Sequence, residues 1–110
     1  SENILDCFIE FYLSLDHTKH VSEGCPIAAL ARDFSMADKK LRKEFSKMLD
    51  FLFEERRKIL TRNNKTISRE EWIGITSTYV GALILSRATK GEELSSEILT
   101  SAKKFIKEKT

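Results

Sequence analysis

The chain has 110 residues, with 19 lysines and arginines against 17 aspartates and glutamates, which leaves a net charge of +2. A net charge so close to zero argues against strong sequence-independent binding of nucleic acid, because such binding needs a concentrated basic face. Hydrophobic residues make up 41% of the chain, enough for a single domain with a modest core. Two cysteines are too few for a disulfide framework and indicate reduced thiols.

The sequence has no feature of a membrane protein. No apolar run approaches the roughly 20 residues that a membrane-spanning helix needs. The first residues, "SENILDCF", lack both an initiating methionine and the basic-then-apolar layout of a signal peptide. We therefore expect a cytoplasmic chain without membrane contact, in which residues 1–110 are one domain of a longer protein.

Helical periodicity dominates from the first residues onward. One proline and four glycines leave few interruptions, and no segment reads as a strand, so the sequence predicts an all-α fold of about five helices. The first helix would precede the polar run 16–24, which predicts a loop. Its inward face would carry Ile4, Phe8, Phe11, Tyr12 and Leu15.

Local signals predict where the next two helices begin. Pro26 suits the first position of a helix, because its missing N–H group would have no partner there. Ser35, followed three residues later by Asp38, resembles a capping box and would open a third, long helix. The apolar residues that repeat at helical spacing along this helix are Leu41, Phe45, Met48, Leu49, Leu52 and Ile59.

The start of the fourth helix has the sharpest local signal in the chain. Ser68 and Glu71 form a full Ser-x-x-Glu capping box, and Ile67 and Trp72 occupy the two positions of a hydrophobic staple. From Trp72 the next 14 residues, "WIGITSTYVGALIL", contain no charge. A helix that is apolar all round must be covered on more than one side.

Small residues follow one side of this fourth helix, which we expect to end near Gly91. Gly74, Ser77, Thr78 and Gly81 would let another helix approach closely, either inside one chain or across an interface between two chains. The fifth helix, which begins near Leu94, also has a wider apolar stripe than a terminal surface helix needs. Together the last two helices favour a two-fold interface that forms a four-helix bundle.

Other chemistry is poorly supported by the residues. Cys25 precedes a helix N-terminus, where the helix dipole lowers a thiol pKa, so it is a candidate thiol sensor with Cys7 as its resolving partner. The simpler interpretation is a compact, buried cysteine. His17 and His20 precede Cys25 in the polar run but lack a fourth ligand for zinc, and we expect two solvated loop histidines.

No phosphate-binding loop and no hydroxyl nucleophile with a plausible base occurs in the sequence. We therefore expect no enzyme activity, no cofactor and no metal. The aromatic residues on the inward faces of four helices either fill a tight core or line a cavity for an apolar ligand. Arg56 falls near that inward side, where it would form a structural salt bridge or meet an anionic ligand.

Four segments in their order resemble the C-terminal domain of tetracycline-repressor-type (TetR family) transcriptional regulators. They are "GCPIAALARDFS", "ADKKLRKEFSKMLDFLFEERRKIL", "EWIGITSTYVGALILSRAT" and "SSEILTSAKKFI", and the resemblance covers nearly the whole chain. Its most specific parts are residues 24–30 and 80–88. The N-terminal half of such regulators, with its helix-turn-helix unit and connecting helix, is not in this sequence.

The resemblance implies a bacterial effector-sensing and dimerisation domain. Such a domain binds a small apolar or aromatic molecule between its helices and pairs through its last two helices, while operator DNA is bound by the separate N-terminal domain. The implied ligand-binding residues are Phe8, Phe11, Tyr12, Cys25, Leu30, Phe34, Phe45, Met48, Leu49, Leu52, Trp72, Thr76 and Tyr79. The implied dimer-interface residues are Ile73, Ser77, Val80, Gly81, Ile84, Ala88, Leu94, Ile98, Ala102 and Phe105. The rival interpretations are a helical homodimeric module without a ligand, and the thiol sensor at Cys25.

Overall fold

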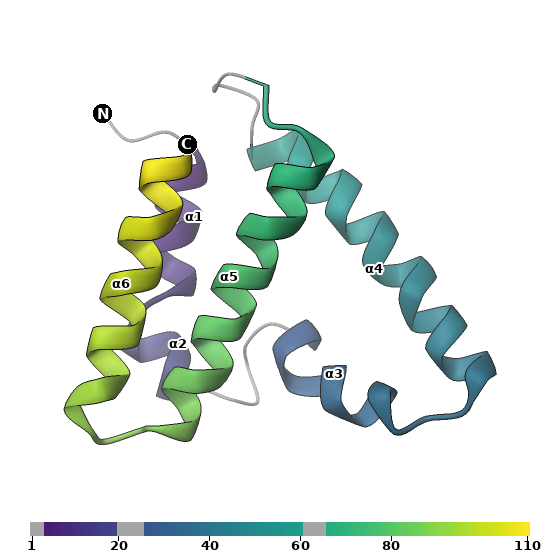
Figure 1. Ribbon diagram of the computed structural model, residues 1–110, viewed down its shortest axis with the longest axis horizontal. Coiled ribbons are helices and arrows are strands. Elements are labelled where there is room, and N and C mark those ends of the chain that lie inside the picture. Colours follow the sequence, from purple (N-terminus) through teal and green to yellow (C-terminus); the bar gives the residue numbers. More distant parts are fainter. Residues whose placement is uncertain (1–3, 20–25, 61–65) are drawn as a thin grey trace.

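The computed structural model describes residues 4–19, 26–60 and 66–110, and every regular element in these ranges is an α-helix. The helices are α1 (Ile4–Tyr12), α2 (Leu15–Lys19), α3 (Pro26–Ser35), α4 (Lys39–Leu60), α5 (Arg69–Ala88) and α6 (Glu93–Lys109), as Figure 1 shows. The prediction of an all-α fold is confirmed. The helix that opens with Pro26 is also confirmed.

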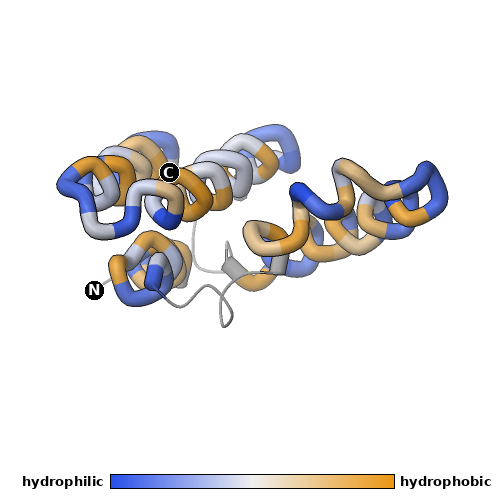
Figure 2. The backbone as a smooth tube through the Cα atoms, turned by 90° about the horizontal axis from the view of Figure 1, so that it is seen from below, coloured by the Kyte–Doolittle hydropathy of each residue, from blue (hydrophilic) through white to orange (hydrophobic). Residues whose placement is uncertain are grey.

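The six described helices form a compact body and an arm. Helices α5 and α6 make an antiparallel hairpin, and α1 packs against both (Figure 1). Helix α4 meets α5 near the N-terminal end of α5 and diverges from it, so that α3 and α4 extend to one side (Figures 1 and 2). The molecule is therefore flat, with extents of 44 × 37 × 20 Å.

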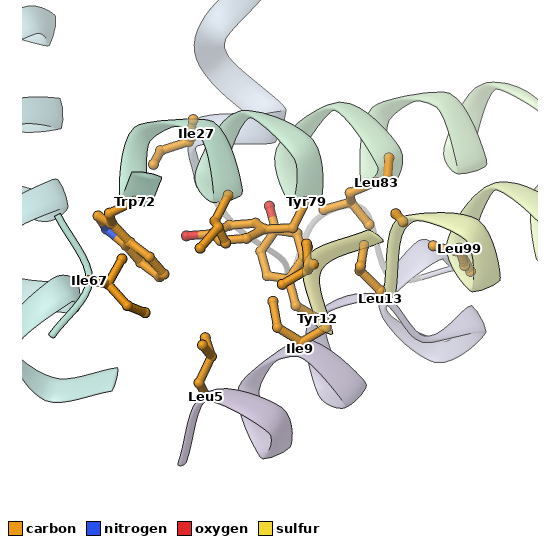
Figure 3. Packing of buried hydrophobic residues seen from close by; sticks show 14 residues of the cluster. Leu5, Ile9, Tyr12, Leu13, Ile27, Ile67, Trp72, Tyr79, Leu83 and Leu99 are labelled. Atoms are coloured by element: carbon orange, nitrogen blue, oxygen red, sulfur yellow. The ribbon is translucent and has the colours of Figure 1, made fainter. Parts of the chain in front are cut away.

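The buried core lies mainly between α1, α5 and α6, with Ile27 of α3 contributing at its edge, and Figure 3 shows its packing. Helix α4 covers this core without entering it: Leu49, Leu52 and Phe53 pack against the cluster and remain partly exposed. The core members are Leu5, Ile9, Tyr12, Leu13, Ile27, Ile67, Trp72, Ile75, Tyr79, Ala82, Leu83, Leu99, Ala102 and Ile106.

The start of α5 confirms its sequence signal. The Ser68 hydroxyl accepts the Glu71 N–H at 3.1 Å, and the Glu71 carboxylate accepts the Ser68 N–H at 3.1 Å, which completes the capping box. Ile67 and Trp72 are both buried and lie next to each other in Figure 3, as a hydrophobic staple requires. The staple fixes the direction in which the chain enters α5.

The first segment differs from its prediction in two ways. Helix α1 ends at Tyr12, and part of the expected loop forms the short helix α2. The buried face of α1 is also shifted by one residue, because Leu5, Ile9 and Leu13 point inward while Phe11 is 68% exposed. Both sides of this segment carry apolar residues at helical spacing, so periodicity alone selects the wrong one.

The start of α4 also differs. Ser35 belongs to α3, where its hydroxyl donates to the carbonyl of Arg32. Asp38 caps α4 instead: its carboxylate accepts the Leu41 N–H at 2.9 Å, and its carbonyl accepts the Arg42 N–H. An aspartate at this position accepts a hydrogen bond from an otherwise unpaired N–H group of the first turn. Its negative charge also interacts favourably with the positive end of the helix dipole.

A short turn joins α5 to α6. Helix α5 ends at Ala88, three residues before Gly91, which has a φ of 90°. Side chains other than hydrogen are strained at such an angle, so Gly91 enables the reversal that places α6 against α5. No helix in the described ranges is both long and apolar enough to cross a membrane.

Candidate functional site

Four aromatic rings from α1 and α5 meet at the core. The two tyrosines lie at the centre of the buried cluster, as Figure 3 shows. The rings of Tyr12 and Tyr79 pack edge to face with centroids 4.6 Å apart. Phe8 lies 5.5 Å from Tyr12 and 5.3 Å from Tyr79, and Trp72 lies 6.1 Å from Tyr79. Four of the predicted ligand-binding residues are thus brought together, and the contacts of Tyr79 with Tyr12 and with Phe8 are edge to face, which is favourable beyond their buried area.

A second aromatic pair belongs to the arm. Phe34 of α3 and Phe45 of α4 stack with centroids 4.6 Å apart and planes inclined by 20°. This stack joins the two helices of the arm to each other. The other predicted ligand-binding residues of the arm differ in their exposure. Leu49 and Leu52 pack against the core, whereas Leu30 and Met48 are 42% and 39% exposed.

Phe11 does not line the core, which corrects the prediction for this residue. Its ring is mostly exposed and stacks on the imidazole of His17, with centroids 5.7 Å apart. His17 in turn is buried rather than solvated, and its Nδ1 lies 2.8 Å from the Tyr12 carbonyl oxygen. Because a carbonyl only accepts, Nδ1 carries the proton, and the imidazole satisfies the C-terminal end of α1.

The polar groups of the aromatic cluster are deeply buried. The hydroxyls of Tyr12 and Tyr79, the Thr76 hydroxyl and the Trp72 indole nitrogen all have almost no solvent contact. Among the described residues, the Trp72 Nε1 and the Thr76 Oγ1 have no hydrogen-bond partner. A buried donor without a partner is unfavourable and requires an explanation.

The structure describes only part of the residues considered for thiol sensing and metal binding. Cys25 and His20 lie outside the described residues, and Cys7 is exposed on α1. The described ranges hold no cluster of three histidine, cysteine or acidic side chains that could bind a metal ion.

Charged residues anchor α4 at the start of α5. Arg69 binds Asp50 at 2.6 Å and Glu54 at 2.9 Å, and Arg57 donates to the Ile67 carbonyl at 2.7 Å. The hydrogen bond from Arg69 is the main cause that lowers the pKa of the Glu54 carboxyl, with a further contribution from Arg57. These contacts place the C-terminal half of α4 over the aromatic core.

The opposite side of α5 joins one side of α6 in an exposed apolar face. We call it the α5–α6 outer face and define it by Gly74, Thr78, Gly81, Leu85, Leu94, Ile98 and Phe105. Among these, Leu85 is 56%, Leu94 51% and Phe105 50% exposed. A Cβ added at Gly74 or at Gly81 would meet no heavy atom within 4 Å. The glycines therefore do not serve close packing inside this chain.

A groove runs along the outer face between the two helices. It has a volume of about 360 Å³ and an apolar lining that includes Gly74, Thr78, Ile75 and Phe105. Glu71 and Lys109 lie at its polar border. The absence of a side chain at Gly74 and the outward position of Phe105 create this hollow, which is open to a second molecule.

Most predicted interface residues lie on or beside the outer face. Gly81, Leu94, Ile98 and Phe105 belong to it, and Ile73, Ser77, Ile84 and Ala88 are partly or fully exposed along α5, whereas Val80 packs partly buried against the core. Ala102 is an exception, because it is buried in the chain's own core. Sequence reasoning missed Leu85, which follows Gly81 by four residues and therefore shares its side of the helix.

Comparisons of this chain with models of known protein families, with curated proteins and with solved structures found no match. The resemblance to TetR-type regulators therefore stays a prediction. Helix α5 has two contrasting sides: a buried aromatic side, on which Trp72 and Thr76 have donors without a partner among the described residues, and an exposed apolar side with two glycines.

Proposed function

We propose that this chain is the effector-sensing and dimerisation domain of a TetR-type transcriptional regulator in a bacterial cytoplasm. The observation that carries the proposal is the α5–α6 outer face, an apolar surface on two neighbouring helices with open space at both of its glycines. Operator DNA would be bound by a separate helix-turn-helix domain. The proposed occupant of the outer face is a second copy of the chain.

The extent of exposed surface supports a second copy. The chain has an accessible surface of 7,270 Å². A compact monomer of its mass would expose about 6,200 Å², so roughly 1,000 Å² is in excess. A standard protein interface buries about 800 Å² of each partner, which is comparable to this excess. Two copies that pair α5 and α6 around a two-fold axis would bury the half-exposed leucines and Phe105.

The glycines favour a helix as the covering element. Without side chains at Gly74 and Gly81, the backbone of α5 can approach another helix closely, and the groove beside Gly74 can receive an apolar side chain. A self-complementary pairing also places each Glu71 and Lys109 near the border of the interface, where charged groups keep contact with water. The four helices would then form a bundle.

Sensing would use the other side of α5. The aromatic cluster and the outer face are two sides of the same helix, so a molecule that enters the core and displaces α5 changes the relative orientation of the two copies. Such a molecule alters operator affinity only if it binds the two orientations with different affinity. The tested consequence is therefore twofold: the chain dimerises, and its core binds a small molecule.

The dimer is tested by Gly81→Leu and Gly74→Leu, measured by sedimentation velocity at micromolar concentration. We expect the unaltered chain to sediment as a dimer and each variant as a monomer with unchanged helical circular dichroism, because the added side chains meet open space within one copy. Ser46→Leu, which adds the same side chain to exposed surface of α4, should remain a dimer. A well-folded monomer of the unaltered chain would refute the proposal, as would dimeric leucine variants.

A further inference from the structure

The buried polar side chains of the described residues differ in how they are satisfied. They are His17, Thr18, Thr76, Ser86 and Ser95. Four of them have hydrogen bonds within the chain: His17 to the Tyr12 carbonyl, Thr18 to Ser86, Ser86 to the Leu83 carbonyl and Ser95 to the Ser86 carbonyl. The Thr76 hydroxyl is the exception among them.

Trp72, one turn earlier on α5, also has a buried polar group without a hydrogen-bond partner, its indole Nε1. Its side chain is 0% exposed and that of Thr76 is 4% exposed, and the spacing of four residues places both on one side of the helix. The indole N–H can only donate, and the threonine hydroxyl can donate as well as accept. These are two buried donors on adjacent turns of one side of α5, and neither has an acceptor among the described residues.

The charge of the surroundings favours a neutral occupant over a cationic one. No aspartate or glutamate of the described residues is buried. The partly buried Glu54 is already held by Arg57 and Arg69. Aromatic faces can stabilise a cation, but an ammonium group cannot accept a hydrogen bond from the Trp72 N–H or the Thr76 hydroxyl, so it would leave the indole donor unsatisfied.

We infer that the molecule sensed by this core is neutral and carries an oxygen acceptor, such as a ketone, ester or amide carbonyl, on an apolar body. Its oxygen would accept from the Trp72 Nε1 and the Thr76 Oγ1, while its apolar part packs against the rings of Phe8 and Tyr79. This inference rests on the proposed sensing function and narrows its ligand class.

Access to this site is favoured from the side of α4. Leu49, Leu52 and Phe53 cover the core there but remain partly exposed, and α4 diverges from α5 beyond this contact (Figure 1). A displacement of α4 would therefore open the aromatic cluster without disturbing the packing of α5 on α6. The apolar cover also keeps water away from the two donors once a ligand is bound.

Three compounds with one skeleton test the ligand class. Acetophenone, cumene and 1-phenylethylammonium carry an oxygen, a methyl group and an ammonium group at the same position of a phenylethyl body. Trp72 is the only tryptophan of the chain, so the protein has a single indole N–H signal in a ¹H–¹⁵N spectrum. We expect acetophenone to shift this signal and to bind at least tenfold more tightly than cumene, with 1-phenylethylammonium the weakest.

Two variants test the donors. Trp72→Phe keeps an aromatic ring and Thr76→Val keeps the side-chain shape, and each should reduce the affinity for acetophenone toward that for cumene in ligand-observed titrations. The affinity for cumene should stay within twofold. Thr100→Val is the matched control, because it makes the same change at an exposed position of α6 outside the outer face. It should bind acetophenone like the unaltered chain.

The outcomes separate the inference from the proposed function. If cumene or the ammonium compound binds as tightly as acetophenone, the core is a ligand site but the acceptor inference is wrong. If Thr76→Val folds normally and leaves the preference for acetophenone intact, the inference is also wrong. If none of the three compounds shifts the indole signal while the chain is a dimer, both the sensing function and the inferred ligand class are wrong. The chain would then be a dimeric module without a ligand.

Discussion

The hydroxyls of Thr18 and Ser86 lie 2.8 Å apart inside the protein, although 68 residues separate them in the chain. Ser86 donates to the Leu83 carbonyl at 2.9 Å, so its oxygen accepts the proton of Thr18. The Ser95 hydroxyl donates to the carbonyl of Ser86 at 2.9 Å. Three residues thereby connect α2, α5 and α6 at the end of the body where the α5–α6 turn lies.

The direction of these hydrogen bonds predicts unequal effects of two substitutions. In Thr18→Val the Ser86 hydroxyl keeps its carbonyl partner, and we expect a loss of about 1 kcal/mol in the free energy of unfolding. In Ser86→Ala the buried Thr18 hydroxyl loses its acceptor, and we expect a larger loss of about 2 kcal/mol. Urea unfolding measures both. Equal losses, or a larger one for Thr18→Val, would contradict the assigned proton positions.

Ser68→Ala should destabilise the protein through the start of α5. The serine hydroxyl satisfies the Glu71 N–H, and its removal should lower the free energy of unfolding by about 1 kcal/mol. Ser68→Asp keeps an acceptor at the cap and should restore most of the stability. The comparison uses thermal or urea unfolding, with the exposed Ser46→Ala of α4 as a control that changes stability by less than about 0.5 kcal/mol.

Glu10 makes the packing of α1 on α6 sensitive to acid. Its carboxylate lies 2.8 Å from the Lys107 ammonium and 3.3 Å from that of Lys103. The hydrogen bond from Lys107 is the largest influence on the Glu10 pKa and lowers it, with Lys103 contributing and partial burial opposing. Because the folded-state pKa lies below the unfolded value of about 4.3, these contacts stabilise the protein near neutral pH and are lost as the pH falls through the folded pKa.

Glu10→Gln tests this dependence. Each contact is partly exposed, so we expect a loss of about 0.2–1 kcal/mol per ion pair at neutral pH and low salt. The difference between the variant and the unaltered chain should stay constant down to about pH 5 and shrink toward zero in more acidic solution. Urea unfolding from pH 7 to pH 3 measures it. A difference that grows on acidification would contradict the predicted sign.

Gly91→Ala should destabilise the turn between α5 and α6 by about 1 kcal/mol, because an alanine is strained at a φ of 90°. Space does not oppose the substitution, since an added Cβ meets nothing within 4 Å. Asparagine tolerates positive φ better than alanine, so Gly91→Asn should be the milder change. Thermal unfolding of the two variants decides this, and an alanine variant as stable as the unaltered chain would show that the turn has another conformation.

Local chemistry was the most predictable part of this protein. The capping box of Ser68 and Glu71, the staple of Ile67 and Trp72 and the position of Pro26 depend on residues close in sequence, and all three predictions are confirmed. The all-α fold was predicted from the helical spacing of apolar residues along the chain. These features need no knowledge of distant contacts, because hydrogen bonds to the nearest backbone groups determine them.

Features that depend on distant partners were missed. Residues 16–19 looked like a loop because they are polar, yet His17 and Thr18 are buried with partners at Tyr12 and Ser86. Phe11 was placed in the core because both sides of α1 are apolar, and only the position of α5 selects the buried one. The Trp72 and Thr76 donors lack partners among the described residues, and this too can be recognised only when the packing around α5 is known.

The asymmetric attachment of the arm has a consequence for slow motions. The second half of α4 is anchored by Arg69 and Arg57, while Leu41 near its beginning is half exposed, and the stack of Phe34 on Phe45 links α3 to that beginning. Backbone amides in α3 and the first turns of α4 should therefore exchange with deuterium well before those of α5, through openings that leave the body folded. If the chain pairs through α5 and α6 as proposed, these openings of the arm would leave that pairing unchanged, because the α5–α6 hairpin belongs to the body.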